Sequence, residues 1–146
     1  LNLVNGVNYK VIGSASVSDK IDIACYYGNS AQSFILTSPT FTNLALYVYT
    51  VALYKEDGVA NWAVKNSTTI KKVSMTAEEF NQIQSSDKIQ ELYTNSSITG
   101  SNTSDAISVG DALLIKTQAN KYGVIYVKLL TNKNYGWVTF DLKTQK

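Results

Sequence analysis

The sequence contains no arginine and no histidine, and its thirteen basic residues are all lysine. Histidine is the usual acid and base at neutral pH and the commonest metal ligand, so its absence removes much catalytic and metal chemistry. Arginine is the side chain best shaped for two-pronged binding of carboxylates and phosphates. Any catalytic or anion-binding role must therefore fall to other residues.

Concentrated positive charge is missing as well. The formal net charge is +2, and Lys71 and Lys72 are the only adjacent pair of lysines. Proteins that bind nucleic acids usually gather positive charge on one surface to neutralise several phosphates. The sequence therefore predicts no nucleic-acid partner.

Cysteine and long apolar runs are also scarce. The single cysteine, Cys25, cannot form an internal disulfide, and zinc sites need several Cys or His ligands. We expect Cys25 to be a small buried side chain rather than a reactive thiol. The longest apolar candidate, Leu44–Tyr54, is far shorter than the ~18 residues of a membrane span. These features predict no metal, no cofactor and no membrane insertion by the domain itself.

Apolar residues make up 45% of the 146 residues, whereas charged residues make up only 16%. This is enough apolar surface to offset the chain entropy that folding removes. A chain of this length usually forms one core. We predict a single β-rich domain over residues 1–146.

Period-2 alternation and turn residues predict three strands in the first third of the chain. In the best of them, Ile21, Ile23, Cys25 and Tyr27 share one face, which is typical of a half-buried strand. Gly13-Ser14, Gly28-Asn29 and Ser38-Pro39 provide the breaks. The predicted strands are Val7–Ile12, Lys20–Tyr27 and Gln32–Leu36. The segment Leu44–Tyr54 fits strand and helix equally well.

A helix start is the clearest local signal in the sequence. Thr76 and Glu79 have capping-box spacing, with Met75 and Phe80 at the staple positions. Ser85 is a second candidate N-cap. Its spacing to Lys88 also resembles a serine–lysine catalytic pair, but the companion motifs of such enzymes are absent. We predict one or two short helices around residues 77–93.

Asn95–Asp105 has the composition of a loop, and three strands follow it as a meander over Ala112–Thr117, Gly123–Leu130 and Gly136–Lys143. In the last strand, Val138, Phe140 and Leu142 face one way, and Trp137 faces the other with Thr139 and Asp141. The predicted fold class is α+β, predominantly antiparallel β, as a sandwich or a partly open barrel.

Ten tyrosines and two tryptophans are the unusual part of the composition. Flat rings with polar tips suit sugar faces and protein partners, but Tyr is also an ordinary residue of half-buried sheets. We expect Trp137, Tyr135 and Trp62 to be the candidate ligand-binding residues, with Trp137 and Tyr135 on one polar face.

Paired carboxylates are the remaining route to catalysis, because glycoside hydrolysis needs two of them across a cleft. The candidates are Asp19, Asp22, Glu91, Asp111 and Asp141. Sequence spacing does not bring any two of them together, and solvation at turns and strand edges explains them.

Several segments together resemble a recurrent, largely uncharacterised domain of secreted lipoproteins in Bacteroides-like bacteria. The resemblance rests on Tyr26-Tyr27-Gly28, Trp62 with Asn66-Ser67-Thr68, Met75–Phe80, Gly110-Asp111 and Gly136–Lys143. It implies a β-rich module at the periplasm or the outer-membrane surface, held by a lipid anchor as part of a longer protein. It assigns no functional residues.

The sequence thus favours a non-catalytic binding or structural module, whose partner is a polysaccharide or another surface protein. A carbohydrate-binding domain that uses exposed Trp and Tyr side chains is the first alternative. A carboxylate-pair glycoside hydrolase is the second.

Overall fold

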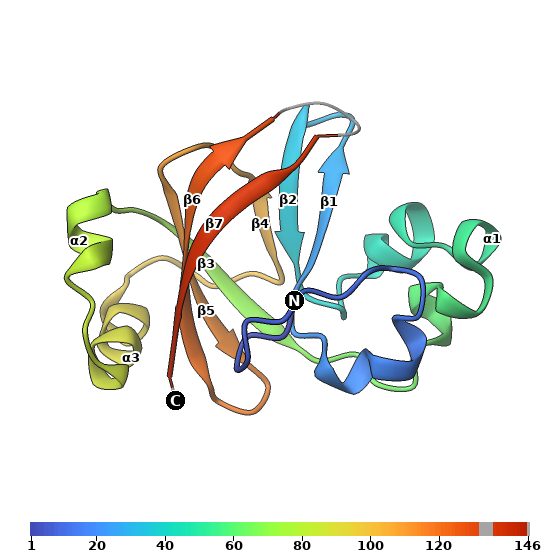
Figure 1. Ribbon diagram of the computed structural model, residues 1–146, viewed down its shortest axis with the longest axis horizontal. Coiled ribbons are helices and arrows are strands. Elements are labelled where there is room, and N and C mark those ends of the chain that lie inside the picture. The colour runs from blue at the N-terminus through green and yellow to red at the C-terminus, as the bar shows by residue number, and fades with distance from the viewer. Residues whose placement is uncertain (132–135, 146) are drawn as a thin grey trace.

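The structure of the protein is a computed structural model that describes residues 1–131 and 136–145. Its strands form two antiparallel sheets (Figure 1). The three-stranded sheet has the order β1 (Ala24–Gly28), β2 (Ser33–Thr37) and β4 (Thr103–Ala106). The four-stranded sheet has the order β3 (Thr68–Ser74), β5 (Asp111–Thr117), β6 (Tyr122–Leu130) and β7 (Val138–Thr144). The predicted α+β class is confirmed, and no closed barrel forms within the described ranges.

The main core lies between the two sheets. Phe34 and Leu36 of β2 meet Leu113 of β5 and Ile125 of β6 in one buried cluster. On β7, the inward side chains are Val138, Phe140 and Leu142, as the alternation predicts. The C-terminal meander is confirmed, with β5, β6 and β7 paired in sequence order.

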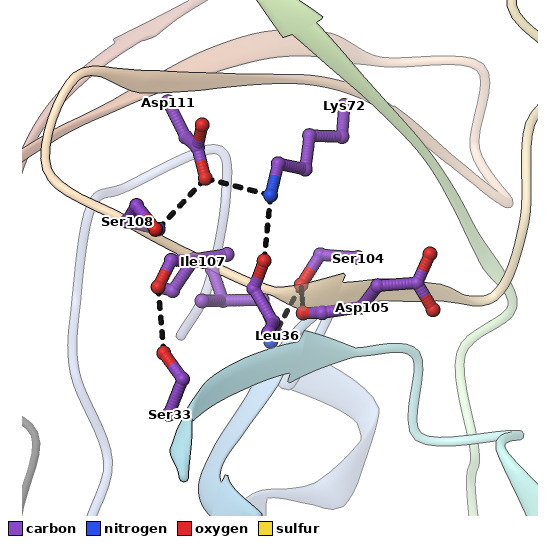
Figure 2. A network of polar contacts seen from close by, with 9 residues as sticks. Ser33, Leu36, Lys72, Ser104, Asp105, Ile107, Ser108 and Asp111 are labelled. Carbon is purple, nitrogen blue, oxygen red and sulfur yellow. Dashed lines mark hydrogen bonds and ion pairs between the residues drawn. The ribbon is translucent and has the colours of Figure 1, made fainter. Parts of the chain in front are cut away.

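A network of polar contacts ties the two sheets together at one edge (Figure 2). The ammonium of Lys72 on β3 lies 2.8 Å from Asp111 Oδ2 on β5 and donates to the carbonyl of Ala106 at 2.6 Å. Ser33 Oγ on β2 donates to the Ile107 carbonyl at 2.6 Å. Lys72 therefore belongs to the four-stranded sheet and binds the last residue of β4 in the other sheet.

Two helices cover the outer face of the four-stranded sheet, α2 (Ala77–Asn81) and α3 (Ser86–Asn95). The predicted capping box is confirmed, since Thr76 Oγ1 accepts from Glu79 N at 3.1 Å and Thr76 N donates to Glu79 Oε2 at 2.7 Å. The second predicted N-cap is confirmed too, because Ser85 Oγ accepts from Lys88 N at 3.2 Å. The hydroxyl of Ser85 thus stabilises a helix start.

Two lysines of the sheet bind the carbonyl ends of these helices. Lys71 Nζ donates to the carbonyls of Tyr93 and Ser96, each at 2.9 Å. Lys143 Nζ donates to the carbonyls of Asn81 and Ile83, at 2.9 and 2.8 Å. A cation at the carbonyl end of a helix is favourable because it offsets the partial negative charge there. The lysines anchor both helices to the sheet.

A second cluster of short helical turns lies beyond β1, at the opposite end of the molecule from α2 and α3 (Figure 1). We call it the helical lobe. It consists of Ala15–Lys20, Leu44–Val48, α1 (Val51–Tyr54), Lys55–Asp57 and Val59–Asn61. Leu44, Val59 and Trp62 form its own small core with Ile21 and Ala24. The ambiguous segment Leu44–Tyr54 is therefore helical.

Asp57 connects several segments of this lobe through hydrogen bonds. Its two carboxylate oxygens accept from Gly13 N at 2.8 Å and Ala15 N at 3.1 Å, while its carbonyl accepts from Trp62 Nε1 at 3.0 Å. One buried side chain thus joins the N-terminal segment to the turns around Trp62.

Three predicted boundaries are wrong. Val7–Ile12 is not a strand: it lies between Gly6 and Gly13, which both have positive φ and turn the chain. The strand predicted from Lys20 begins only at Ala24, so Ile21 packs in the lobe whereas Ile23 packs between the sheets. The predicted loop Asn95–Asp105 contains the start of β4. Its polar composition does not indicate a strand, but the segment pairs with β2.

Candidate functional site

The helices leave part of the outer sheet face uncovered. Leu114, Tyr122, Val124 and Tyr126 lie beneath α2 and α3, and the ring of Phe80 stacks on Tyr126 with centroids 5.4 Å apart. Beyond Tyr126, none of the described helices covers the outward side chains of β6 and β7 in this way. Leu129 is 52% exposed and Trp137 is 59% exposed.

We call this uncovered area the Trp137 strip; it consists of Lys128, Leu129, Trp137, Thr139 and Asp141. Leu129 pairs with Thr139 across the two strands. Lys128 Nζ lies 3.1 Å from Asp141 Oδ2, and both side chains are about half exposed. The strip therefore combines an exposed flat ring with a charged donor and a charged acceptor.

The length of the strip follows from strand geometry. Trp137 precedes Val138, the first residue of β7, and Asp141 lies four residues after Trp137 on the same face. At about 3.3 Å per residue, the two side chains leave the chain about 13 Å apart. This length suits an extended ligand better than a single small molecule.

The three predicted site residues do not come together. Trp137 is exposed as expected, and Tyr135 lies outside the described residues. The predicted exposure of Trp62 is wrong, since only 5% of this residue is exposed. Its ring fills the core of the helical lobe, and its Nε1 donates to the carbonyl of Asp57. Sequence reasoning missed Leu129 and Lys128, since a bulge between Val127 and Leu129 shifts the alternation of β6.

Three of the candidate carboxylates are bound to lysines. Asp111 Oδ2 is 2.8 Å from Lys72 Nζ, Asp141 is held by Lys128, and Glu91 Oε2 is 3.2 Å from Lys88 Nζ. Asp111 also accepts from Ser108 N at 2.7 Å. These contacts give each carboxylate a structural role.

Asp22 is the buried member of the set. Its Oδ2 accepts from Leu3 N at 2.8 Å. Burial raises the pKa of this carboxyl above its ordinary value, and the hydrogen bond from Leu3 opposes that rise.

Asp22→Asn is therefore expected to stabilise the protein at neutral pH. Below the ordinary pKa, the carboxyl is neutral in both the folded and the unfolded chain. As the pH rises through the raised pKa, the natural carboxylate must ionise in a buried place, whereas asparagine stays neutral and can still accept from Leu3. Urea unfolding at several pH values should show an advantage of Asp22→Asn that grows with pH. The exposed control, Asp19→Asn, should show no such trend, and an advantage for Asp22→Asn that shrinks would contradict the interpretation.

The thiol of Cys25 lies in a protected place. Burial raises the pKa of Cys25 to about 12. The hydroxyl of Tyr49 donates to the carbonyl of Cys25, and burial raises the pKa of Tyr49 too. Because the thiolate is the reactive form, the thiol is a poor nucleophile at neutral pH.

The helical lobe also carries four exposed apolar side chains that lie near one another in the sequence, Leu46, Tyr47, Val51 and Leu53. Tyr47 is 75% exposed and Leu53 is 72% exposed. No charged residue occurs in the sequence between Asp22 and Lys55. A grouping of exposed apolar side chains is typical of a surface that contacts another macromolecule.

Among the described residues, no three His, Cys, Asp or Glu side chains gather in a way that could hold a metal ion. No helix in that part of the chain is long and apolar enough to cross a membrane. Comparisons with protein-family models, curated proteins and solved structures found no match. The resemblance to secreted lipoprotein domains therefore stays a prediction.

Proposed function

We propose that this chain is a non-catalytic binding module that recognises an extended carbohydrate through the Trp137 strip. One observation carries the proposal: the only tryptophan exposed among the described residues lies on the uncovered part of a sheet face, beside the Lys128–Asp141 ion pair. An aromatic ring can stack on the apolar face of a sugar. A neighbouring carboxylate and ammonium can bind hydroxyl groups at the edge of the same sugar chain.

The strip is rigid where the ligand would lie. Four of its residues belong to the paired strands β6 and β7, whose inward side chains pack in the main core, and the carbonyl of Trp137 accepts from Thr131 N at 3.0 Å. A site built on paired strands loses little entropy when it binds, because its side chains are already positioned. The proposed location at the periplasm or cell surface rests on the sequence resemblance alone.

Trp137→Ala is expected to lower the affinity for a bound polysaccharide by about tenfold or more, because it removes the stacking surface. Affinity electrophoresis through gels that contain a broad panel of soluble polysaccharides measures this directly. The matched control is Tyr47→Ala, which removes an exposed ring from the helical lobe. This variant should migrate like the natural protein.

Two results would overturn the carbohydrate proposal. One is the absence of retardation across the whole panel. The other is retardation that survives in Trp137→Ala while the far-ultraviolet circular dichroism stays unchanged. Loss of retardation in Tyr47→Ala alone would move the site to the helical lobe.

A second candidate function is docking of another surface protein on the helical lobe. The exposed apolar side chains Leu46, Tyr47, Val51 and Leu53 favour it. The carboxylate-pair hydrolase receives the least support, because lysines bind three of its five candidate carboxylates.

A further inference from the structure

A pocket of about 280 Å³ lies where the helical lobe meets the open side of the sandwich. Its apolar walls come from both sheets and from the segment before β1. Ile23 precedes β1, Leu36 comes from β2, and Val138 and Phe140 come from β7. The volume is near the low end of the roughly 300–1,000 Å³ found for small-molecule sites. The pocket is distinct from the Trp137 strip, since Val138 and Phe140 face inward and Trp137 faces outward.

Three polar groups of the pocket wall are bound to other parts of the protein. The hydroxyl of Tyr49 donates to the Cys25 carbonyl, and the indole N–H of Trp62 donates to the Asp57 carbonyl. Ser14 Oγ also donates to that carbonyl, at 3.3 Å. With these donors in use, the wall offers a ligand apolar contact except at Asn8, Tyr9 and Lys10.

Lys10 differs from the other polar groups in its charge. Among the described residues that line the pocket, it is the only charged side chain. Its ammonium forms no hydrogen bond or ion pair with the part of the chain that the structure describes. No carboxylate of the described residues lines the pocket to compete for it. The site therefore combines an apolar interior with one unpaired positive charge.

We propose that this pocket binds a small monocarboxylate with an apolar body. The carboxylate pairs with the ammonium of Lys10, and the apolar body contacts Ile23, Leu36, Val138 and Phe140. A purely apolar ligand would gain nothing from the ammonium of Lys10, which is exposed, and a cationic ligand would be repelled by it. A dicarboxylate would bury a second charge against apolar walls, which is costly.

The binding test uses octanoate as the ligand, octanol as its neutral equivalent and acetate as a carboxylate without an apolar body. Cys25 provides a reporter, because it lines the pocket and is the only cysteine in the sequence. Because the raised pKa of Cys25 makes the thiol slow to react, alkylation by iodoacetamide is followed over hours at pH 9 by mass spectrometry of the intact protein, and a ligand in the pocket should slow it further. Octanoate should protect Cys25 at lower concentration than octanol, and acetate should not protect it.

Lys10→Gln is expected to weaken octanoate binding about fivefold, the size of a partly exposed ion pair, and to leave octanol binding unchanged. The matched control is Lys55→Gln, an exposed lysine on the helical lobe that does not line the pocket. It should bind octanoate like the natural protein.

Three results would overturn the proposal: no protection by octanoate, equal protection by octanol and octanoate, or an equal effect of Lys10→Gln and Lys55→Gln. The polysaccharide test of Trp137→Ala uses the opposite face of β7. Failure of one test therefore leaves the other standing.

Discussion

Replacing Gly58 with alanine is expected to destabilise the protein by about 3 kcal/mol or more, at the upper end of the cost of overpacking a tight site. A Cβ atom at this position would lie 2.7 Å from both the Cα and the N of Val51, and 2.9 Å from the carbonyl carbon of Thr50. These are backbone atoms, so no side-chain rotation relieves the clash. The φ of Gly58 is −60°, which any residue can adopt. Glycine is therefore required here because the backbone of Thr50 and Val51 lies so close.

The position of Gly58 makes the clash hard to avoid. Val59 N donates to the Tyr49 carbonyl at 2.9 Å, and Gly58 N donates to the Lys55 carbonyl at 3.1 Å. Both bonds hold the turn against the start of α1. A shift that relieves the clash must break one of them or displace Val59, which is fully buried in the lobe core.

Urea unfolding and hydrogen exchange measure the result. Lobe amides in Gly58→Ala should exchange faster, while amides of β5 and β6 keep most of their protection. The matched control is Gly13→Ala, where φ is +87° and no atom lies within 4 Å of the added Cβ. At Gly13 the substitution meets no clash, and it lowers the free energy of unfolding by about 1 kcal/mol because alanine disfavours a positive φ. If Gly58→Ala were as stable as Gly13→Ala, the turn could move away from α1 without a loss of stability, and the interpretation would be wrong.

Replacing Ile125 with alanine is expected to lower the free energy of unfolding by about 2–5 kcal/mol. Ile125 is fully buried between the two sheets and pairs with Leu113 on one side and Leu142 on the other. The lost methyl groups leave a cavity that the paired strands cannot close, because their positions are fixed by hydrogen bonds.

Leu129→Ala on the same strand is the control for this substitution. Leu129 faces outward on the Trp137 strip and is half exposed, so its truncation should change stability by less than about 0.5 kcal/mol. Denaturant midpoints of the two variants give the comparison. Equal losses at both positions would mean that the bulge between Val127 and Leu129 is wrong, since in a regular strand residues 125 and 129 lie on the same face.

The parts of the fold that sequence predicts well depend on local chemistry. The capping box at Thr76 and Glu79 works within one helical turn, so the residues that form it are visible in the sequence. The meander β5–β6–β7 joins neighbouring segments, and the inward face of β7 follows from alternation. In each case the partners lie close together along the chain.

The parts that sequence reasoning missed depend on distant partners. No signal marked β3, whose two lysines interrupt its apolar pattern, and whose strand partner β5 lies beyond both helices. β4 is polar and pairs with β2 across more than 60 residues. Trp62 looked available because Ile21, Ala24 and Leu44, which bury its ring, lie far from it in the sequence. Of the candidate site, the shared outward face of Trp137, Thr139 and Asp141 could be predicted, whereas the bulge in β6 hid Lys128 and Leu129.

The contacts of Lys71 and Lys143 with the helix carbonyls affect how the protein can be handled in the laboratory. Acylation of a lysine amine removes its charge and most of its donors. Reagents that couple proteins to beads or dyes through amines would therefore release both helix ends from the sheet, and at Lys128 they would alter the Trp137 strip itself. Immobilisation through a terminal tag keeps these amines intact, so binding measured on amine-coupled protein would underestimate the affinity of the native surface.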